Sequence, residues 1–296
     1  MTQKSRIVPE VLPWLYLLLL TLVWGSSFIL IKKGLEVYSA TQVSAIRILS
    51  AALFMIPFAI SWLRRVDKEY YGLIFISGLI GSFVPAILFA VAQTRLASAV
   101  TGMVNAMTPV FVLIIGYLFY AQRIARTKVI GLFLAFGGTA ILMLYGGGTG
   151  YQFNYFALFV VLATLLYGIN LNILKFKLSA LDPIAIASIS LLMMGPFAAI
   201  QLFGLSDFGH TFSHSPHALM ALGYLSVLGI VGTGLALMLF NQLIKMTTPL
   251  FSSSVTYLIP IVAVAWGLID GEKLHLMHYL GMAIIIGGVY LANKKK

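Results

Sequence analysis

The sequence predicts an all-α polytopic membrane protein, with ten transmembrane helices arranged as two inverted five-helix repeats. The first observation behind this prediction is composition, because 60% of the 296 residues are hydrophobic and only 9% are charged. A soluble domain carries about 25% charged residues. The lipid bilayer is therefore the expected surrounding of most of the chain. The other two observations are the number of apolar runs and the placement of the basic residues.

A membrane-spanning helix needs about 20 apolar residues, and ten stretches of the chain come close to this length. They cover residues 14–31, 41–63, 71–94, 97–120, 129–145, 155–174, 183–204, 217–242, 249–269 and 276–293. The uncharged region 129–174 is too long for one helix, so we divide it at the glycine-rich segment 146–150, a loop signal. The apolar run 11–31 exceeds the 7–15 residues of a signal-peptide core, so we expect it to be a retained span.

The lysines and arginines orient these spans. If the N-terminus is cytoplasmic, 14 of the 19 basic residues fall in inner segments and one, Arg47, falls within a span. The outer segments then hold only Lys32, Lys33, Arg95 and Lys273. This positive-inside bias predicts two cytoplasmic termini in the inner (plasma) membrane of a prokaryote. Nucleic acid is not an expected partner, because the basic residues lie between apolar runs instead of on a soluble face.

The two halves of the chain repeat. A shift of 151 residues places Pro109 on Pro260 and Gly116 on Gly267 without a gap. Each copy has five spans, an odd number, so the second copy enters the membrane from the opposite side, as in many secondary transporters. The predicted segments are a cytoplasmic tail (1–12), a first repeat (13–145), a glycine-rich outer loop (146–154), a second repeat (155–293) and a basic cytoplasmic tail (294–296).

Four motifs carry a resemblance to a known family. They are VWGSSFILIK (23–32), Arg47 in the second span, PVFVLIIGYLF (109–119) and IPIVAVAWGLIDGEKL (259–274). Together they resemble the EamA branch of the drug/metabolite transporter superfamily, over about residues 13–293. The last motif, which ends in Gly271 and Glu272, is the most specific. The family often has Glu at the corresponding place in the first half, where this chain has Gln122 or Ala121, depending on the position of a one-residue gap.

Arg47 is the strongest candidate for a functional side chain. It lies roughly 10 Å below the membrane surface, at 1.5 Å per helical residue. An intramembrane charge is a functional candidate because burying it in lipid costs several kcal/mol. Arg47 is expected either to bind a substrate carboxylate or a gate, or to be a structural residue that extends toward the surface or bonds helix-end carbonyls.

Polar and aromatic residues inside the spans are the other candidates for a substrate site. Amides and hydroxyls can line a cavity or bond neighbouring helices, and aromatic rings can form its walls or pack against lipid. The predicted substrate-binding residues are Trp24, Ser27, Arg47, Asn105, Tyr167, Asn170, Thr256 and Tyr257. Asn105 and Thr256 occupy equivalent places in the two repeats, each one turn before a proline.

Five prolines lie in the interiors of predicted spans. They are Pro57, Pro85, Pro109, Pro196 and Pro260. Proline frees a backbone carbonyl and bends a helix, so these residues are candidates either for moving gates or for static kinks.

The chain lacks several kinds of chemistry. It has no cysteine, and its eight acids fall in loops or at predicted helix ends, so no intramembrane carboxylate is available for proton coupling. The histidines 210, 214 and 217 lie in an outer loop and are expected to be solvated. We therefore predict no catalytic residue, no metal site and no cofactor.

The function indicated is secondary transport of a small metabolite by alternating access, and facilitated movement fits the missing carboxylate. The family resemblance implies export or facilitated movement of amino acids or similar small molecules. The alternatives are lipophilic drugs or another metabolite class such as nucleotide sugars, and, outside transport, a membrane enzyme or a structural membrane protein. The expected assembly is a monomer or a weak homodimer, because the resemblance places the fifth and tenth helices at the periphery.

Overall fold

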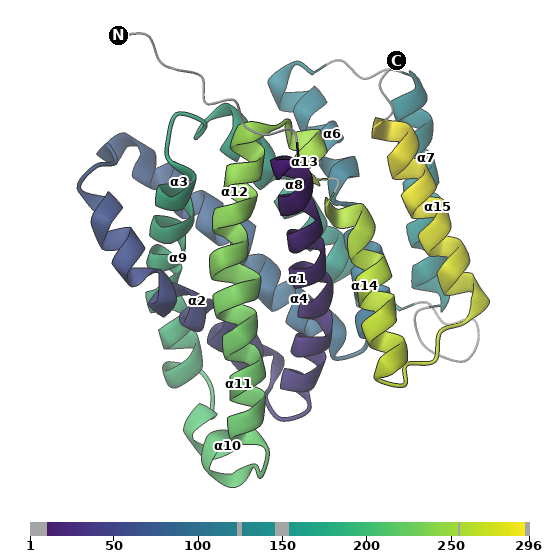
Figure 1. Ribbon diagram of the computed structural model, residues 1–296. Helices are drawn as coiled ribbons and strands as arrows, with labels where there is room; N and C mark the ends of the chain where they lie inside the picture. The colour runs from purple at the N-terminus through teal and green to yellow at the C-terminus, as the bar shows by residue number, and fades with distance from the viewer. Residues whose placement is uncertain (1–10, 123–125, 146–153, 254, 294–296) are drawn as a thin grey trace, which may run out of the picture.

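The computed structural model describes residues 11–122, 126–145, 154–253 and 255–293, which form a bundle of helices (Figure 1). The first half contains α1 (Leu12–Leu35), α2 (Ala40–Leu63), η1 (Lys68–Tyr70), α3 (Tyr71–Gly78), η2 (Leu79–Phe83), α4 (Val84–Gln93), α5 (Ser98–Asn105), α6 (Thr108–Tyr120) and α7 (Arg126–Tyr145). The second half contains α8 (Ala157–Phe176), α9 (Pro183–Ala199), η3 (Ile200–Gly204), α10 (Phe208–His214), α11 (Ala218–Gly229), η4 (Ile230–Leu235), α12 (Ala236–Met246), α13 (Pro249–Ser253), α14 (Val255–Ile269) and α15 (Leu276–Asn293). The predicted tails and the glycine-rich loop lie almost entirely outside the described residues.

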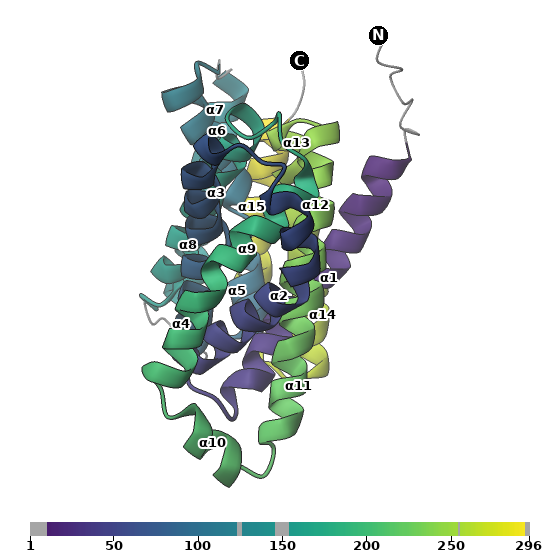
Figure 2. The ribbon, with the colours of Figure 1, turned by 90° about the vertical axis from the view of Figure 1, so that its left-hand side faces the viewer.

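Eight helical stretches of the described chain are long and apolar enough to cross a membrane. They are Leu12–Leu35, Ala40–Leu63, Lys68–Gln93, Ser98–Tyr120, Ala157–Phe176, Pro183–Gly204, Ala218–Met246 and Phe251–Ile269. The other two predicted spans are the helices α7 and α15, whose apolar stretches Val129–Leu142 and Leu276–Gly288 are shorter. Helix α1 begins, and α15 ends, at the same end of the bundle, and the short helix α10 lies at the opposite end (Figures 1 and 2).

Three spans contain a π segment: η2 and η4 lie partway along their spans, and η3 forms the end of the span that begins with α9. A π turn widens the helix and leaves backbone groups available for other partners, and such turns are frequent at functional sites. The sequence GIVGTG, whose glycine spacing resembles a phosphate loop, runs through η4 and is therefore part of a helix. Two of these π segments, η2 and η4, correspond to each other at the shift of 151 residues.

The predicted prolines accompany several of the helix irregularities. Pro57, Pro196 and Pro260 lie inside α2, α9 and α14. Pro85 stands in the first turn of α4, directly after the π segment η2, and Pro109 stands in the first turn of α6, after the break that ends α5. Whether any of them moves during transport stays a prediction.

Helices α7 and α15 pack against each other at one edge of the bundle (Figure 1). Glycine allows this close approach, because a Cβ added at Gly138 would lie 2.7 Å from the Gly281 carbonyl oxygen and 2.8 Å from Ile285 Cγ1. Small residues serve the same purpose at many membrane helix interfaces. The neighbouring Gly137 has no heavy atom within 4 Å of such a Cβ among the described residues.

We expect Gly138→Ala to destabilise the protein by about 1–3 kcal/mol, because the added methyl group overpacks the α7–α15 contact. Gly137→Ala is the matched control, since it makes the same change in helix propensity where there is space. Thermal unfolding of both variants in detergent measures the difference. Equal melting temperatures for the two variants would show that the close contact contributes nothing.

Candidate functional site

A cavity of about 90 Å³ lies among the helices. One buried water needs a cavity of roughly 10–15 Å³. The cavity therefore has room for several waters or for a small solute. Its walls come from α1, α2, η2, α4, α5, α6, α8, η4, α12, α13 and α14. The cavity is therefore lined by residues from both halves of the chain.

Arg47 is the charged residue among the described residues that line this cavity. Its Nε donates a 2.8 Å hydrogen bond to Thr233 Oγ1 in the π segment η4. The close approach of α2 to α11 positions the arginine. The backbone carbonyl of Arg47 lies against Gly229, and a Cβ at that glycine would clash with the carbonyl oxygen. Tyr167 of α8 lines the same cavity. The arginine side chain is partly accessible, and it brings a positive charge to the cavity.

Aromatic rings form much of the wall. Trp24 donates from its indole Nε1 to the carbonyl oxygen of Gly232 at 2.9 Å, a carbonyl that lies within the π segment η4. The same indole packs edge-on against Phe240, with ring centroids 4.8 Å apart. On the other side, Phe89 stacks on Tyr167 at 6.0 Å. The cavity thus has aromatic walls, and a hydrogen bond fixes the indole of Trp24.

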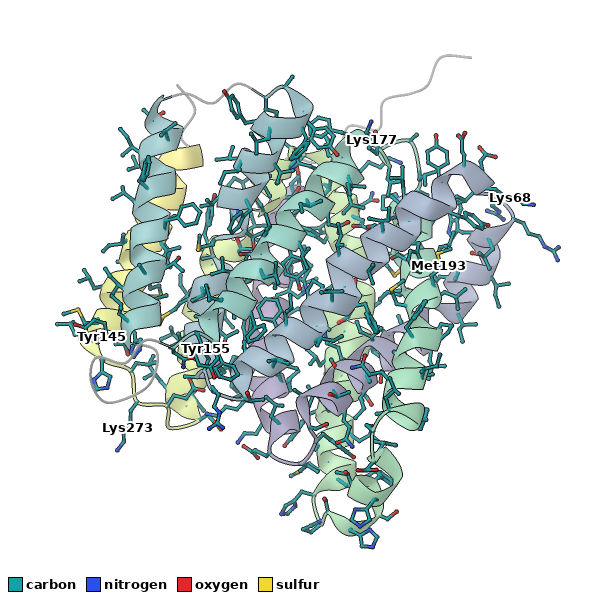
Figure 3. All side chains as sticks on the ribbon, turned by 180° about the vertical axis from the view of Figure 1, so that it is seen from behind. Lys68, Tyr145, Tyr155, Lys177, Met193 and Lys273 are labelled. Carbon is teal, nitrogen blue, oxygen red and sulfur yellow. The ribbon has the colours of Figure 1, made fainter. Side chains whose placement is uncertain are left out.

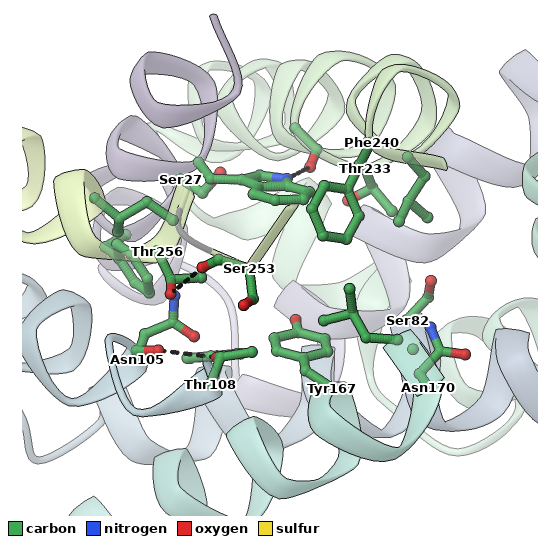
Figure 4. A pocket seen from close by; sticks show the side chains of 18 of the residues that line it. Ser27, Ser82, Asn105, Thr108, Tyr167, Asn170, Thr233, Phe240, Ser253 and Thr256 are labelled. Carbon is green, nitrogen blue, oxygen red and sulfur yellow. Dashed lines mark hydrogen bonds between the residues drawn. The ribbon is translucent and has the colours of Figure 1, made fainter. Parts of the chain in front are cut away.

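Amide and hydroxyl groups complete the lining. Figure 4 shows Asn105, Thr108 and Thr256 on one side of Tyr167, and Asn170 with Ser82 on the other. The hydroxyl of Thr108 donates to the carbonyl of Asn105, and the hydroxyl of Thr256 donates to the carbonyl of Ser253, in each case the last residue of the preceding helix. The amide oxygens Oδ1 of Asn105 and Asn170 are buried and have no hydrogen-bond partner among the described residues. Two acceptors in the lining are therefore available to a ligand.

The structure brings seven of the eight predicted substrate-binding residues into the lining. They are Trp24, Ser27, Arg47, Asn105, Tyr167, Asn170 and Thr256. Tyr257 is absent from the lining, and its buried hydroxyl has no partner in the described chain. Its neighbour Ser253, which lies one turn before it on the chain, faces the cavity instead.

The prediction missed other lining residues, among them Ser82, Thr108, Thr233 and Phe240. The repeat could have found one pair, because a shift of 151 residues places Ser82 on Thr233, next to the matched glycines Gly81 and Gly232. The role of every lining residue in binding stays a prediction.

A second polar cluster, which we call the latch, joins α1, α5 and the end of α14. It consists of Lys32, Lys33, Asp270, Glu272, Ser98 and Ala99. Lys32 Nζ lies 2.7 Å from Asp270 Oδ2 and 2.9 Å from Glu272 Oε1, and Lys33 Nζ lies 2.8 Å from Asp270 Oδ1.

Glu272 is the centre of the latch. Its carboxylate, only 5% exposed, accepts bonds from the backbone N–H and hydroxyl of Ser98 and from the N–H of Ala99, at 2.7–3.1 Å. These N–H groups belong to the start of α5, where a carboxylate also interacts favourably with the helix dipole. Gly271, at φ 79°, makes the turn that returns Glu272 toward Gly267.

The equivalent turn in the first half identifies the counterpart of Glu272. Ala121 has the same left-handed geometry as Gly271, at φ 52°, and the next residue, Gln122, donates its N–H to the carbonyl of Gly116. Gln122 therefore corresponds to Glu272, but it is neutral. Lys175, which matches Lys32 at a shift of 143 residues, instead donates to the carbonyls of Ile244 and Thr247 near the end of α12.

The latch carboxylates titrate below their usual ranges. Burial raises the pKa of Glu272, but hydrogen bonds from Lys32, Ser98 and Ala99 outweigh it, so the pKa lies below the ordinary value of 4.5. Hydrogen bonds from Lys32 and Lys33 lower the pKa of Asp270 below 3.8. Both groups are charged at neutral pH.

We expect the stability contributed by Glu272 to be complete above about pH 4.5 and to be lost as the pH falls through the lowered folded-state value. Thermal unfolding in detergent, measured from about pH 7 to about pH 3, follows this loss. Glu272→Gln should unfold at a lower temperature at neutral pH and should show a shallower decline in acid. Glu36→Gln is the control, because that carboxylate is 54% exposed and pairs with Lys33 at the surface. An unchanged acid profile in Glu272→Gln would contradict the proposed contribution.

Comparisons with known proteins agree with the membrane architecture. The EamA-like transporter family matches residues 12–144 and again residues 154–294. An uncharacterized transporter of Archaeoglobus fulgidus is 23% identical over 96% of this chain and 99% of its own length. The uncharacterized inner membrane transporter YedA of Escherichia coli is 24% identical over 94% of this chain and 89% of its own length.

One relative has a more specific name. A probable terminal-alkyne amino-acid exporter of Streptantibioticus cattleyicolor is 23% identical over 94% of this chain and 92% of its own length. A solved crystal structure shares the fold, with a TM-score of 0.65 and 16% identity, over 95% of this chain and 96% of that chain. Because the family covers nearly all of both halves, the chain belongs to the EamA-like transporter family and is a multi-pass membrane transporter.

Proposed function

We propose that this protein is a secondary transporter that moves a small carboxylate-bearing metabolite across the inner membrane of a prokaryote by alternating access. The observation that carries the substrate class is Arg47, a cation that faces the cavity with a hydroxyl as its hydrogen-bonded partner. A charge in such surroundings is stabilised by an anionic ligand. Amino acids are the first class to test, since one relative is named as a probable amino-acid exporter.

The ten-helix inverted repeat is part of this proposal. It is supported by the two family matches of similar length, by the π segments η2 and η4 that both reach the cavity, and by the matching turns at Ala121 and Gly271. Five spans per copy then invert the second copy, and the cavity lies between the copies.

The proposed orientation places both termini in the cytoplasm. Lys68 and Lys177, two of the predicted cytoplasmic lysines, lie toward one end of the bundle, whereas Lys273 lies toward the other (Figure 3). This distribution supports the positive-inside assignment, and it makes the latch extracytoplasmic. We propose that the latch then closes the outer side of the cavity.

The lining also bears on coupling and on the alternatives. The described lining residues include no Asp or Glu, which supports a facilitator over a proton-coupled exporter. A nucleotide sugar carries several negative charges, and Arg47 is the only cation among those same residues. A lipophilic drug would leave that charge without an ionic partner. A membrane enzyme is not favoured, because the matching family and the relatives are named as transporters.

Flux through the purified protein in liposomes tests the proposal. A panel of labelled amino acids and other small carboxylates is measured with and without a pH gradient, against protein-free liposomes. Flux of at least one carboxylate without a gradient is expected. The absence of flux for the whole panel would refute the substrate class, and strict dependence on the gradient would refute facilitation.

We expect Arg47→Ala to lower flux about 10- to 100-fold at low substrate concentration, because a hydrogen bond to a charged group contributes roughly 1.5–3 kcal/mol. Arg47→Lys should retain part of the flux, since it keeps the charge but loses the planar fork. The melting temperature in detergent serves as the folding control. Normal flux in a well-folded Arg47→Ala protein would reduce the arginine to a structural role.

Access to the cavity tests the orientation and the latch together. The chain has no cysteine, so Ile31→Cys introduces a single thiol at a cavity-lining position that is 2% exposed. A membrane-impermeant thiol reagent added outside intact cells should label it slowly, and adding Glu272→Gln should accelerate labelling severalfold. Lys273→Cys is the control, because it should label rapidly in both backgrounds. Equal labelling of Ile31→Cys with and without Glu272→Gln would contradict closure by the latch.

A further inference from the structure

The charges around the cavity are unbalanced. Arg47 contributes one positive charge to the lining, and no described lining residue contributes a negative one. The carboxylates of Asp270 and Glu272 belong to the latch, where they are already paired with Lys32 and Lys33. The remaining described acids are Glu36, Asp67, Glu69, Asp182 and Asp207, and none of these lines the cavity either.

The lining also contains hydrogen-bond donors and acceptors that a ligand could pair with. The guanidinium fork of Arg47 has five N–H donors, and its Nε is bonded to Thr233. The unsatisfied buried acceptors are neutral amide oxygens, Asn105 Oδ1 and Asn170 Oδ1. A buried acceptor without a partner costs about 1–3 kcal/mol, so a ligand that donates to one of them removes that cost.

We infer, resting on the proposed function, that this site prefers a monoanionic carboxylic acid with a neutral hydrogen-bond donor over a zwitterionic amino acid. The ligand class is a 2-hydroxy acid or an N-acylated amino acid with an apolar side chain. Its carboxylate neutralises Arg47, its hydroxyl or amide N–H donates to an asparagine oxygen, and its side chain packs against the aromatic rings of Trp24, Phe89 and Phe240.

The physical reason is the second cation that an amino acid brings. A zwitterion satisfies Arg47 with its carboxylate, but it also places an ammonium group in a cavity that offers it no carboxylate. A neutral amide oxygen can accept its hydrogen bond but cannot cancel its charge, and a charge enclosed without a counter-charge is costly. A hydroxyl makes the same hydrogen bond without that cost.

A ligand series on one carbon skeleton tests the inference on the unaltered protein. The probes are 2-hydroxyisocaproate, N-acetyl-leucine, leucine, isocaproate and leucinamide, compared at neutral pH by calorimetry in detergent and by competition for flux in liposomes. The hydroxy acid should bind at least about tenfold more tightly than leucine. Isocaproate, which lacks the donor, should bind more weakly than the hydroxy acid, and leucinamide, which lacks the carboxylate, should not bind.

Added charge in the lining provides a second test. Asn170→Asp keeps the side-chain shape and supplies the missing carboxylate, so it should reverse the preference in favour of leucine. Asn241→Asp is the matched control, because Asn241 is also a buried amide with an unpartnered oxygen but lies outside the lining. That control should keep the wild-type preference.

The outcomes separate this inference from the proposed function. Binding and transport of leucine at least as strong as those of the hydroxy acid would overturn the inference and leave carboxylate transport intact. A failure of every carboxylate in the series and in the wider panel to bind or move would overturn both. Because the series uses the unaltered protein, the result does not depend on the folding of any variant.

Discussion

Inside a bilayer every backbone N–H and C=O group needs a partner within the protein, and the cavity depends on this constraint. A regular α-helix satisfies its own backbone and offers a ligand only side chains. Where η4 widens the helix, the Gly232 carbonyl becomes an acceptor for Trp24, and Thr233 receives the bond from Arg47. The irregular segment thus orients both the aromatic wall and the cation. Its counterpart η2 brings Gly81 and Ser82 to the same cavity.

The latch follows from the same constraint at a helix end. The first N–H groups of α5 have no partner within their own helix, and Glu272 supplies one for Ser98 and Ala99 while it pairs with Lys32. Gly267 makes room for this carboxylate, because a Cβ there would lie 2.6 Å from Glu272 Oε2. One side chain therefore ties together α1, α5 and α14.

The two ends of the bundle have the same backbone turn but different chemistry. Gln122 occupies the place of Glu272, and Lys175 bonds helix-end carbonyls instead of a carboxylate. An ionic network around Glu272 therefore joins the helices at one end of the bundle. At the other end the equivalent turn has the neutral Gln122 in place of that carboxylate. In an alternating-access cycle this difference would favour the conformation in which the ionic end is closed.

The sequence by itself determined the all-helical membrane class and the approximate bounds of the helices, and it singled out Arg47 as a charge within a span, because each depends on composition along the chain. It could not determine which face of a helix points inward, since lipid tails and a protein interior accept the same apolar side chains. Tyr257 and Ser253 illustrate the point, for they share one polar stretch and only the serine lines the cavity. The bond from Ser98 to Glu272 joins residues 174 positions apart. Only the tertiary structure decided such contacts, because they depend on how closely packed helices bring distant side chains together.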